Sequence, residues 1–374
     1  MWVVSLNFIL IPFGTIPMAY MQRSMNFQHI ALINVSSNTV SAVTSVGLAY
    51  MGFSYLSLAW GSVAGALCNI VLAQVWRPDG LPMFPGFKDI RKVFSFGALS
   101  SLVMILSDIS QGAAELILGR MAGMGMVGYF GRAMGLVSMF DRFVMSALWS
   151  VALPHFAQQS RDTGAMKGSF LRSMTYATAL AWPFFACLGL LAHPVILILY
   201  GKQWEPSVSL LRLLCIYMMM LSPFLLMSSM MTAIGQMKQN LYLLLIHVPV
   251  RIVLVWLAAP LGIEAIGVAF IAGSLVDITI YYLQCRFILY VNLREIAQAL
   301  YKSAGVAFLS MLLPLCVFLF GDDILSENIW LQLMFDFAGC ALGWLAGIFL
   351  FEHPLKFEVK KIFKTIQPFL NFSK

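Results

Sequence analysis

The chain has 374 residues, of which 60% are hydrophobic and 10% are charged, and its mean hydropathy is +0.86. Soluble domains carry about 25% charged residues, so this composition excludes a soluble globular protein. The formal net charge of +7 would suit a nucleic acid or an anionic surface. The basic residues, however, lie mostly between apolar stretches, which indicates a membrane protein without a nucleic-acid partner.

Apolar runs of roughly 20 residues recur along the chain, and this is the length that crosses a hydrocarbon core. They predict an all-α, polytopic transmembrane bundle of about 11 helices. Pro12, Gly14 and Pro17 interrupt the first span, and the longest internal connection covers only residues 77–92, which leaves no room for an independent soluble domain. In chain order the predicted spans are 2–22, 30–53, 55–76, 93–120, 127–157, 171–199, 206–234, 241–261, 265–290, 301–320 and 329–351.

Basic residues are concentrated in every second predicted loop, as the positive-inside rule requires. Alternate loops, starting with residues 23–29, hold 17 of the 23 basic residues, whereas the opposite loops hold only Arg120 and Lys202. This alternation predicts a cytoplasmic C-terminus and, with an odd number of helices, places residue 1 outside. Met1 leads directly into apolar sequence, so no signal peptide is expected, and we expect upstream helices to be missing.

The six cysteines are scattered singly inside apolar segments, without a CxxC pair or a Cys/His cluster. This pattern favours small buried hydrophobes over disulfides or a zinc site. We therefore expect neither a metal nor a cofactor. His247 stands alone in an apolar run, which favours a structural histidine over a proton carrier.

Ionisable groups at membrane depth are costly, so each needs a partner, a wet cavity or a function. Ser101, Asp108, Gln111 and Glu115 fall at helical spacing on the fourth span, and they form one polar stripe that must face protein or water. Asp277 lies near the centre of the ninth span. Asp108, Gln111, Glu115 and Asp277 therefore predict the polar, ion-coupling part of a cavity.

Four arginines predict an anion site in the same cavity: Arg132, Arg142, Arg212 and Arg251. A guanidinium stays charged and can donate two parallel N–H bonds to phosphoryl oxygens, which suits a diphosphate headgroup whose lipid tail stays in the bilayer. Arg142 and Arg251 lie deepest, and Asp141 points to a different side of the helix from its neighbour Arg142. Alternatively, the arginines pair with the membrane carboxylates and lock the helices together.

The middle of the sequence resembles a known family. The segment Arg120–Ala157, with GRMAGMGMVGYFGRAMGL and SALWSVALPHFA, resembles the centre of the Wzx-type polysaccharide and O-antigen flippases. SLAWGSVAG at 57–65, YGKQWEPSVSLLRLL at 200–214 and the run FSFGALSS agree with it. That family belongs to the superfamily of multidrug, oligosaccharidyl-lipid and polysaccharide exporters. Arg132 falls in a matched motif, whereas Arg142 and Arg251 are nominated from depth and chemistry.

The resemblance implies two six-helix bundles around a central cavity and two additional helices, with about three N-terminal helices absent from this chain. The implied divisions are the remainder of the N-terminal bundle (1–92), a C-terminal six-helix bundle (93–292), two additional helices (293–351) and a basic cytoplasmic tail (352–374).

The substrate implied by the resemblance is a sugar or oligosaccharide on undecaprenyl diphosphate. It would cross the inner membrane by alternating access during exopolysaccharide, capsule or O-antigen (lipopolysaccharide) synthesis. Expected partners are this lipid-linked sugar, membrane lipids, and polysaccharide polymerase or chain-length assembly proteins.

Three alternatives stay open. A drug or cation antiporter of the same superfamily would use Asp108, Glu115 and Asp277, although a basic cavity disfavours a cationic drug. A membrane-embedded polysaccharide-assembly enzyme would place its catalytic residues on a sizeable exposed loop. The outward loops here are short, one with the isolated pair Asp322–Asp323, so no enzyme is expected. The third alternative is a truncated assembly partner that does not transport.

Overall fold

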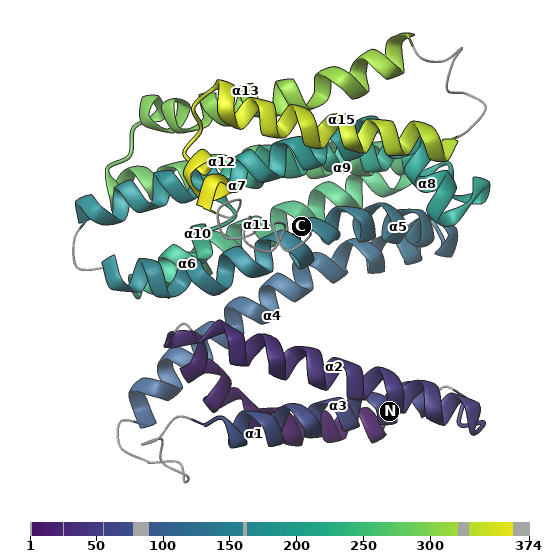
Figure 1. Cartoon of the computed structure of the whole chain (residues 1–374), viewed down its shortest axis with the longest axis vertical. Helices are drawn as coiled ribbons and strands as arrows, with labels where there is room; N and C mark the ends of the chain where they lie inside the picture. Colours follow the sequence, from purple (N-terminus) through teal and green to yellow (C-terminus); the bar gives the residue numbers. More distant parts are fainter. Residues whose placement is uncertain are drawn as a thin grey trace, which may run out of the picture. The chain divides into compact units, whose positions relative to one another are not determined.

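The computed structural model describes residues 2–24, 26–54, 56–77, 90–159, 163–320 and 329–361. These residues form helices and turns with no strand among them, which confirms the predicted all-α class (Figure 1). They belong to two compact units, Met1–Ile90 and Arg91–Lys374. Parts of the predicted loops and tail, at 78–89, 160–162, 321–328 and 362–374, lie outside the described residues.

The first unit consists of α1 (Trp2–Arg23), α2 (Phe27–Tyr50) and α3 (Leu56–Val75). Both α1 and α2 pack on α3. Pro17 cannot donate a backbone N–H to the carbonyl of Phe13, and Gln74 Nε2 of α3 donates to that oxygen at 3.1 Å instead. α1 therefore continues through Pro17, and Pro12 also lies inside this helix.

Small residues bring α2 and α3 into close contact. A Cβ on Gly61 of α3 would lie 2.8 Å from the carbonyl oxygen of Ser41 on α2, so a larger side chain would push the two helices apart.

The many serines, threonines and asparagines of α2 also lower its hydropathy. Ten helices within the described residues are long and apolar enough to cross a membrane. They match ten of the predicted spans, and α2 supplies the remaining one as a helix of 24 residues.

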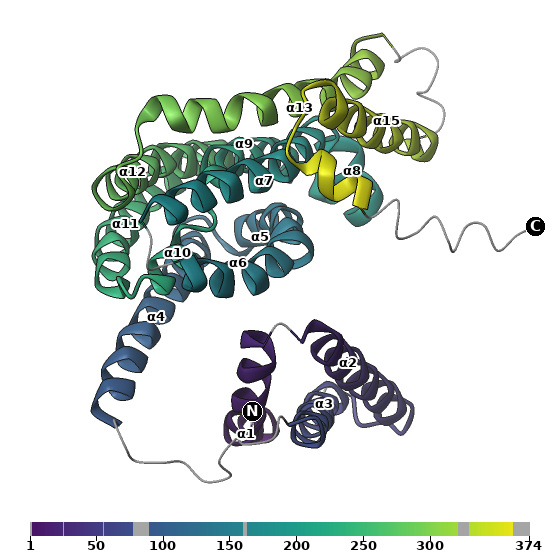
Figure 2. The ribbon, with the colours of Figure 1, turned by 60° about the vertical axis from the view of Figure 1, so that its left-hand side comes forward.

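The second unit is a larger bundle in which α7 packs against α9 and α13, and α12 packs against α9 and α11. Figure 2 shows α7, α9 and α12 stacked side by side. Its helices are α4 (Ile90–Met121), α5 (Met124–Phe140), α6 (Ser146–Gln159), α7 (Thr163–Leu190), α8 (Ala192–Tyr200), α9 (Ser207–Leu221), α10 (Met227–Ala233), α11 (Met237–Ala258), α12 (Ile263–Leu289), α13 (Leu293–Phe320) and α15 (Ile329–Leu350).

Three of the predicted spans contain breaks in their helical hydrogen bonding. A π-helical turn at Asp141–Met145 joins α5 to α6. Leu191 separates α7 from α8, and a short 3₁₀ turn at Ser222–Phe224 separates α9 from α10. Pro194 lies three residues after Leu191, and Pro223 lies within the 3₁₀ turn. Each proline lacks a backbone N–H and so removes one donor. The breaks redirect side chains within spans that hydropathy treats as uniform.

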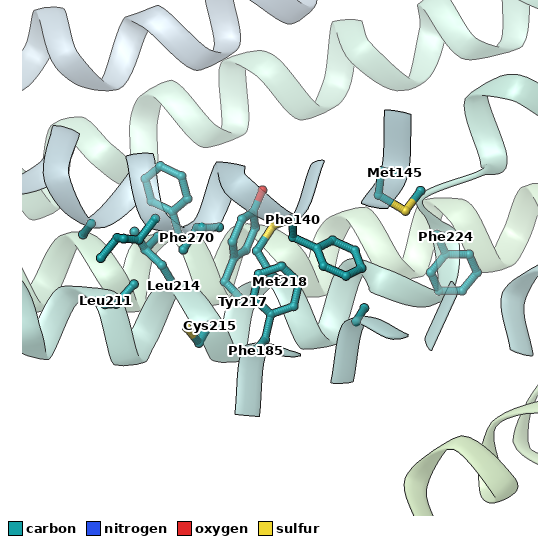
Figure 3. Close-up of a cluster of buried hydrophobic side chains, with 14 of the residues drawn as sticks. Phe140, Met145, Phe185, Leu211, Leu214, Cys215, Tyr217, Met218, Phe224 and Phe270 are labelled. Atoms are coloured by element: carbon teal, nitrogen blue, oxygen red, sulfur yellow. The ribbon is translucent and has the colours of Figure 1, made fainter. Parts of the chain in front are cut away.

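Aromatic packing holds the centre of the second unit together. Figure 3 shows a buried cluster in which the Phe140 ring of α5 lies 5.0 Å from the Phe185 ring of α7. Tyr217 and Met218 of α9 belong to the same buried cluster. Apolar side chains gain little from leaving lipid for protein, so association of these helices depends on close packing and on polar contacts between helices. The division of this unit at residues 292 and 293 stays a prediction.

Candidate functional site

A cavity of about 420 Å³ lies inside the second unit and collects polar side chains from five helices and the π-helical turn. The turn contributes Asp141 at its first position, and turns of this kind recur at functional sites. The polar lining comprises Ser107, Ser110, Gln111 and Glu115 of α4, Ser138 of α5, Asp141, Tyr217 of α9, His247 and Arg251 of α11, and Asp277 and Tyr281 of α12.

Arg251 is held in place by two aromatic rings. Its Nη2 donates a hydrogen bond to the Tyr217 hydroxyl, and its guanidinium carbon lies 4.4 Å from the centroid of the Phe270 ring and 5.2 Å from that of Tyr217. The two rings meet edge to face at 5.3 Å. A cation placed over aromatic faces is stabilised without a counter-ion, which leaves the positive charge available to a ligand.

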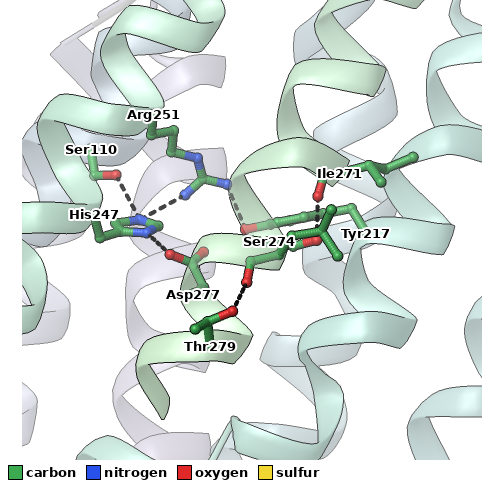
Figure 4. Close-up of polar contacts among 9 residues, drawn as sticks. Ser110, Tyr217, His247, Arg251, Ile271, Ser274, Asp277 and Thr279 are labelled. Atoms are coloured by element: carbon green, nitrogen blue, oxygen red, sulfur yellow. Dashed lines mark hydrogen bonds and ion pairs between the residues drawn. The ribbon is translucent and has the colours of Figure 1, made fainter. Parts of the chain in front are cut away.

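His247 connects Arg251 to a buried carboxylate (Figure 4). One turn of α11 separates His247 from Arg251, so both side chains lie on the same face. The His247 Nδ1 atom bonds the Asp277 carboxylate, which is only 2% exposed. On its other side, His247 Nε2 lies 3.5 Å from Arg251 Nη1 and 3.4 Å from Ser110 Oγ.

These partners assign the tautomer of His247. An ionised carboxylate only accepts hydrogen bonds and a guanidinium only donates them. The neutral imidazole therefore carries its hydrogen on Nδ1, facing Asp277, and accepts from Arg251 at Nε2. The result is a chain of three polar groups, Arg251, His247 and Asp277, across the cavity wall.

The structure places the other predicted acidic and amide residues as follows. Asp108, Gln111 and Glu115 of the predicted stripe are all exposed, but only Gln111 and Glu115 line the cavity. Asp141 lines it as well, and its Oδ1 is buried without a hydrogen-bond partner among the described residues. Asp277 pairs with His247, so the expected lock between Asp277 and an arginine is replaced by a histidine contact.

Three of the four predicted arginines lie away from this cavity. Arg142 and Arg212 are exposed. Arg132 lies over the rings of Tyr200 and Trp204, 5.0 and 4.8 Å from their centroids. Asp141, at the first position of the π-helical turn, lines the cavity, while the adjacent Arg142 is exposed and lies outside the lining.

The described cavity is not basic. Among the described lining residues, Arg251 is the one arginine, against three carboxylates: Glu115, Asp141 and Asp277. His247, interpreted from the sequence as a structural histidine, also lines the cavity, and its position one helical turn before Arg251 was the signal that links the two residues. No group of three or more His, Cys, Asp or Glu side chains in the described part of the chain could hold a metal ion.

Comparison with known proteins decides the family. The family model described as "Polysaccharide biosynthesis protein" matches residues 1–209. The chain belongs to this polysaccharide biosynthesis family. The matched part includes Glu115 and Asp141, while Tyr217, His247, Arg251 and Asp277 follow it.

Three relatives each match somewhat more than half of the chain. The succinoglycan biosynthesis transport protein ExoT of Rhizobium meliloti (strain 1021) is 27% identical over 220 residues, which are 56% of this chain and 42% of ExoT. The lipopolysaccharide biosynthesis protein WzxC of Escherichia coli (strain K12) is 22% identical and matches over 57% of this chain and 44% of WzxC. The teichuronic acid biosynthesis protein TuaB of Bacillus subtilis (strain 168) is also 22% identical, over 57% of this chain and 45% of TuaB. The matches thus span less than half the length of each relative.

A solved structure shares the fold. The lipid II flippase MurJ, in an inward closed conformation, superposes with a TM-score of 0.59 at 13% identity, over 85% of this chain and 67% of MurJ. The names of MurJ and ExoT denote transport rather than catalysis. With ten apolar helices of membrane-spanning length among the described residues, this member of the family is a multi-pass membrane protein.

Proposed function

We propose that this protein flips undecaprenyl-diphosphate-linked sugar or oligosaccharide units across the inner membrane for polysaccharide biosynthesis. The observation that carries the proposal is Arg251, a charged guanidinium held inside a membrane-embedded cavity of a chain that belongs to the polysaccharide biosynthesis family. Similarity to ExoT, WzxC and TuaB supports the polysaccharide pathway, and the shared fold with MurJ supports flipping of a lipid-linked sugar.

The cavity suits a polar headgroup rather than a whole lipid. Its volume of about 420 Å³ is typical of small-molecule sites. The headgroup would enter the cavity while the polyprenyl tail stays in the bilayer. Arg251 would turn its Nη1 donor from His247 to a diphosphate oxygen while Nη2 keeps its bond to Tyr217, because charge-assisted bonds to phosphate are stronger than those to neutral acceptors.

The proposal also includes a topology and a division of the chain. We place the C-terminus in the cytoplasm and keep the sequence-based divisions 1–92, 93–292, 293–351 and 352–374. A polymerase or a chain-length protein is the proposed partner on the membrane, and the additional arginines Arg132, Arg142 and Arg212 would act outside the described cavity.

A cation antiporter of the same superfamily is the second candidate. The three carboxylates of the lining, Glu115, Asp141 and Asp277, favour it, because carboxylates can exchange a cation for protons. Family membership favours the flippase.

Flipping of a fluorescent undecaprenyl-diphosphate sugar in proteoliposomes tests the proposal. Arg251→Gln removes the charge but keeps a polar side chain. It should slow flipping at least about tenfold, since a hydrogen bond to a charged group contributes about 1.5–3 kcal/mol. Arg286→Gln, an exposed arginine near the end of α12, is the matched control and should flip at the wild-type rate.

The alternatives give different results in the same vesicles. If Arg212→Gln slows flipping as much as Arg251→Gln, the anion site is not confined to the described cavity. A folded protein that moves no lipid-linked sugar but exchanges a cationic dye for protons would replace the flippase with the antiporter.

A further inference from the structure

The charges of the cavity do not match the proposed cargo. Its described lining carries one arginine and three carboxylates, so it is net negative while His247 is neutral. A diphosphate brings further negative charge close to these carboxylates, and like charges repel one another. Admitting the anion therefore requires compensation, and the smallest available compensating charge is a proton.

His247 is the group best placed to take that proton. Histidine is the side chain whose ordinary titration falls between about pH 5 and 8. Its Nδ1–H already bonds Asp277, so the resulting imidazolium would keep a carboxylate partner. The added proton would bind Nε2, which carries no hydrogen in the neutral ring and lies 3.5 Å from Arg251 Nη1 and 3.4 Å from Ser110 Oγ.

Protonation at Nε2 also changes Arg251. The nitrogen that accepted the guanidinium N–H becomes a donor, so the contact between His247 and Arg251 turns from a hydrogen bond into a repulsion between two cations. Arg251 keeps Tyr217 and Phe270 as partners, and its Nη1 donor becomes available. Two N–H groups, one from each residue, can then bond the same phosphoryl oxygens.

We propose that His247 is a proton-binding site linked to the anion site at Arg251, so that a proton enters the cavity when a diphosphate binds and leaves when the diphosphate leaves. The proposal rests on the proposed diphosphate substrate. Linkage is reciprocal: if the proton strengthens anion binding, the bound anion strengthens proton binding by the same factor.

Several other titratable groups face His247 across the cavity, and each belongs to an element that lines it. Glu115 and Asp141 are the remaining carboxylates, and Tyr217 and Tyr281 are the phenols. The phenols titrate far above neutral pH in their ordinary range. The two carboxylates could also take a proton, so the experiment must separate His247 from them. The titratable and charged groups that face His247 are Glu115 of α4, Asp141 of the π-helical turn, Tyr217 of α9, Arg251 of α11, and Asp277 and Tyr281 of α12.

Calorimetry measures the protons directly. Undecaprenyl diphosphate in detergent micelles is titrated into the full chain in two buffers of different ionisation enthalpy near pH 7. The variant His247→Asn keeps an N–H donor near the position of Nδ1 for Asp277 but cannot take a proton. The control is His193→Asn, which removes a histidine from an exposed pair with Glu205 at 3.6 Å, outside the cavity.

The wild type and His193→Asn should take up about one more proton per bound diphosphate than His247→Asn. The diphosphate itself titrates, but it contributes equally to all three proteins. The affinity of the wild type should rise by up to about tenfold per unit decrease in pH, and that of His247→Asn should change less. If His247→Asn does not fold, His247→Gln serves in its place.

Equal proton uptake in the wild type and in His247→Asn overturns the inference and leaves the proposed flippase standing. Absence of diphosphate binding to folded protein overturns both the inference and the proposed substrate. A third outcome is proton uptake that depends on His247 in a protein that flips no lipid-linked sugar. It would support the linked proton site and contradict only the proposed flippase function.

Discussion

At the scale of single residues, the position of Arg251 depends on neutral neighbours. The Tyr217 hydroxyl and the Phe270 ring hold its guanidinium without cancelling its charge, while Asp277 is engaged by His247. A direct ion pair would instead neutralise the arginine and compete with any anionic ligand. Burial of an unpaired charge is costly, so this arrangement is expected where a ligand supplies the missing counter-charge.

Tyr217→Phe tests this role of the hydroxyl. The substitution removes the hydrogen bond to Arg251 but keeps the ring beside the guanidinium. Diphosphate affinity should fall about fivefold, since a net hydrogen bond contributes about 1 kcal/mol, and flipping should slow in step. Tyr242→Phe, on the same helix as Arg251 but 63% exposed, is the control. An unchanged affinity in Tyr217→Phe would show that the rings alone position the arginine.

Hydropathy predicted how deep each charged residue lies, but not the side of the helix that it faces. Arg142 and Arg251 are comparable in depth, yet Arg251 lines the cavity and Arg142 is exposed. The direction depends on which neighbouring helices pack on each face, and sequence spacing within one helix contains no such information. For the same reason the stripe correctly grouped Gln111 and Glu115, but it also included Asp108, which lies outside the cavity lining.

At the scale of elements, polar contacts tie α13 and α15 to α7. Trp344 Nε1 donates to the carbonyl of Ala179 at 2.8 Å, and Thr178 Oγ1 donates to Ser303 Oγ at 2.9 Å. Contacts of this kind specify helix pairing where lipid competes for every apolar surface. His353, just beyond α15, extends this network with Nε2 at 3.3 Å from Ser303 Oγ.

His353 should make the stability of this part of the bundle depend on pH. Burial, together with the nearby Lys302, lowers the pKa of His353 to about 4, whereas an unfolded histidine has a pKa of about 6.5. Between these values the unfolded chain binds more protons, so the free energy of unfolding decreases as the pH falls from 6.5 towards 4 and is fully retained above 6.5.

Thermal melting in detergent, followed by tryptophan fluorescence between pH 4.5 and 7.5, checks this expectation. The melting temperature of the wild type should fall across the acidic part of the range. His353→Asn should melt lower at neutral pH, because it loses the Ser303 contact, and should show a flatter dependence on pH. Equal slopes in both proteins would assign the acid sensitivity to other groups.

Helix existence was predictable here, and helix continuity was not. Runs of apolar residues fixed the number of spans because each must be long enough to cross the membrane. The π-helical turn Asp141–Met145 contains no proline or glycine from which the sequence could have predicted it. Pro12 and Pro17 suggested an interruption of α1, yet α1 is continuous, and Gln74 of α3 bonds the Phe13 carbonyl that Pro17 leaves without its helical donor. Such breaks depend on tertiary partners, which a scan along one helix cannot see.

At the scale of the second unit, basic loops gather at one end of the bundle. Lys167, near the start of α7, bonds Glu295 at 2.8 Å and donates to the carbonyl of Tyr290 at 3.0 Å. Lys302 of α13 donates to the carbonyl of Glu352 at 3.0 Å. The loops before α7 and α13 and the segment after α15 therefore meet, as the alternation of basic residues predicted for loops on one side of the membrane.

The orientation of this end is a separate prediction, because the fold is the same whichever side it faces. The positive-inside rule places the basic end in the cytoplasm. In a variant whose native cysteines are replaced, Lys202→Cys, in the connection between α8 and α9, should react with a membrane-impermeant maleimide in intact cells. Lys238→Cys, at the start of α11, should react only after the membrane is permeabilised. Both residues are exposed, so accessibility within the protein does not distinguish them. The opposite labelling would show that the basic end lies outside the cell, and the proposed topology would then be inverted.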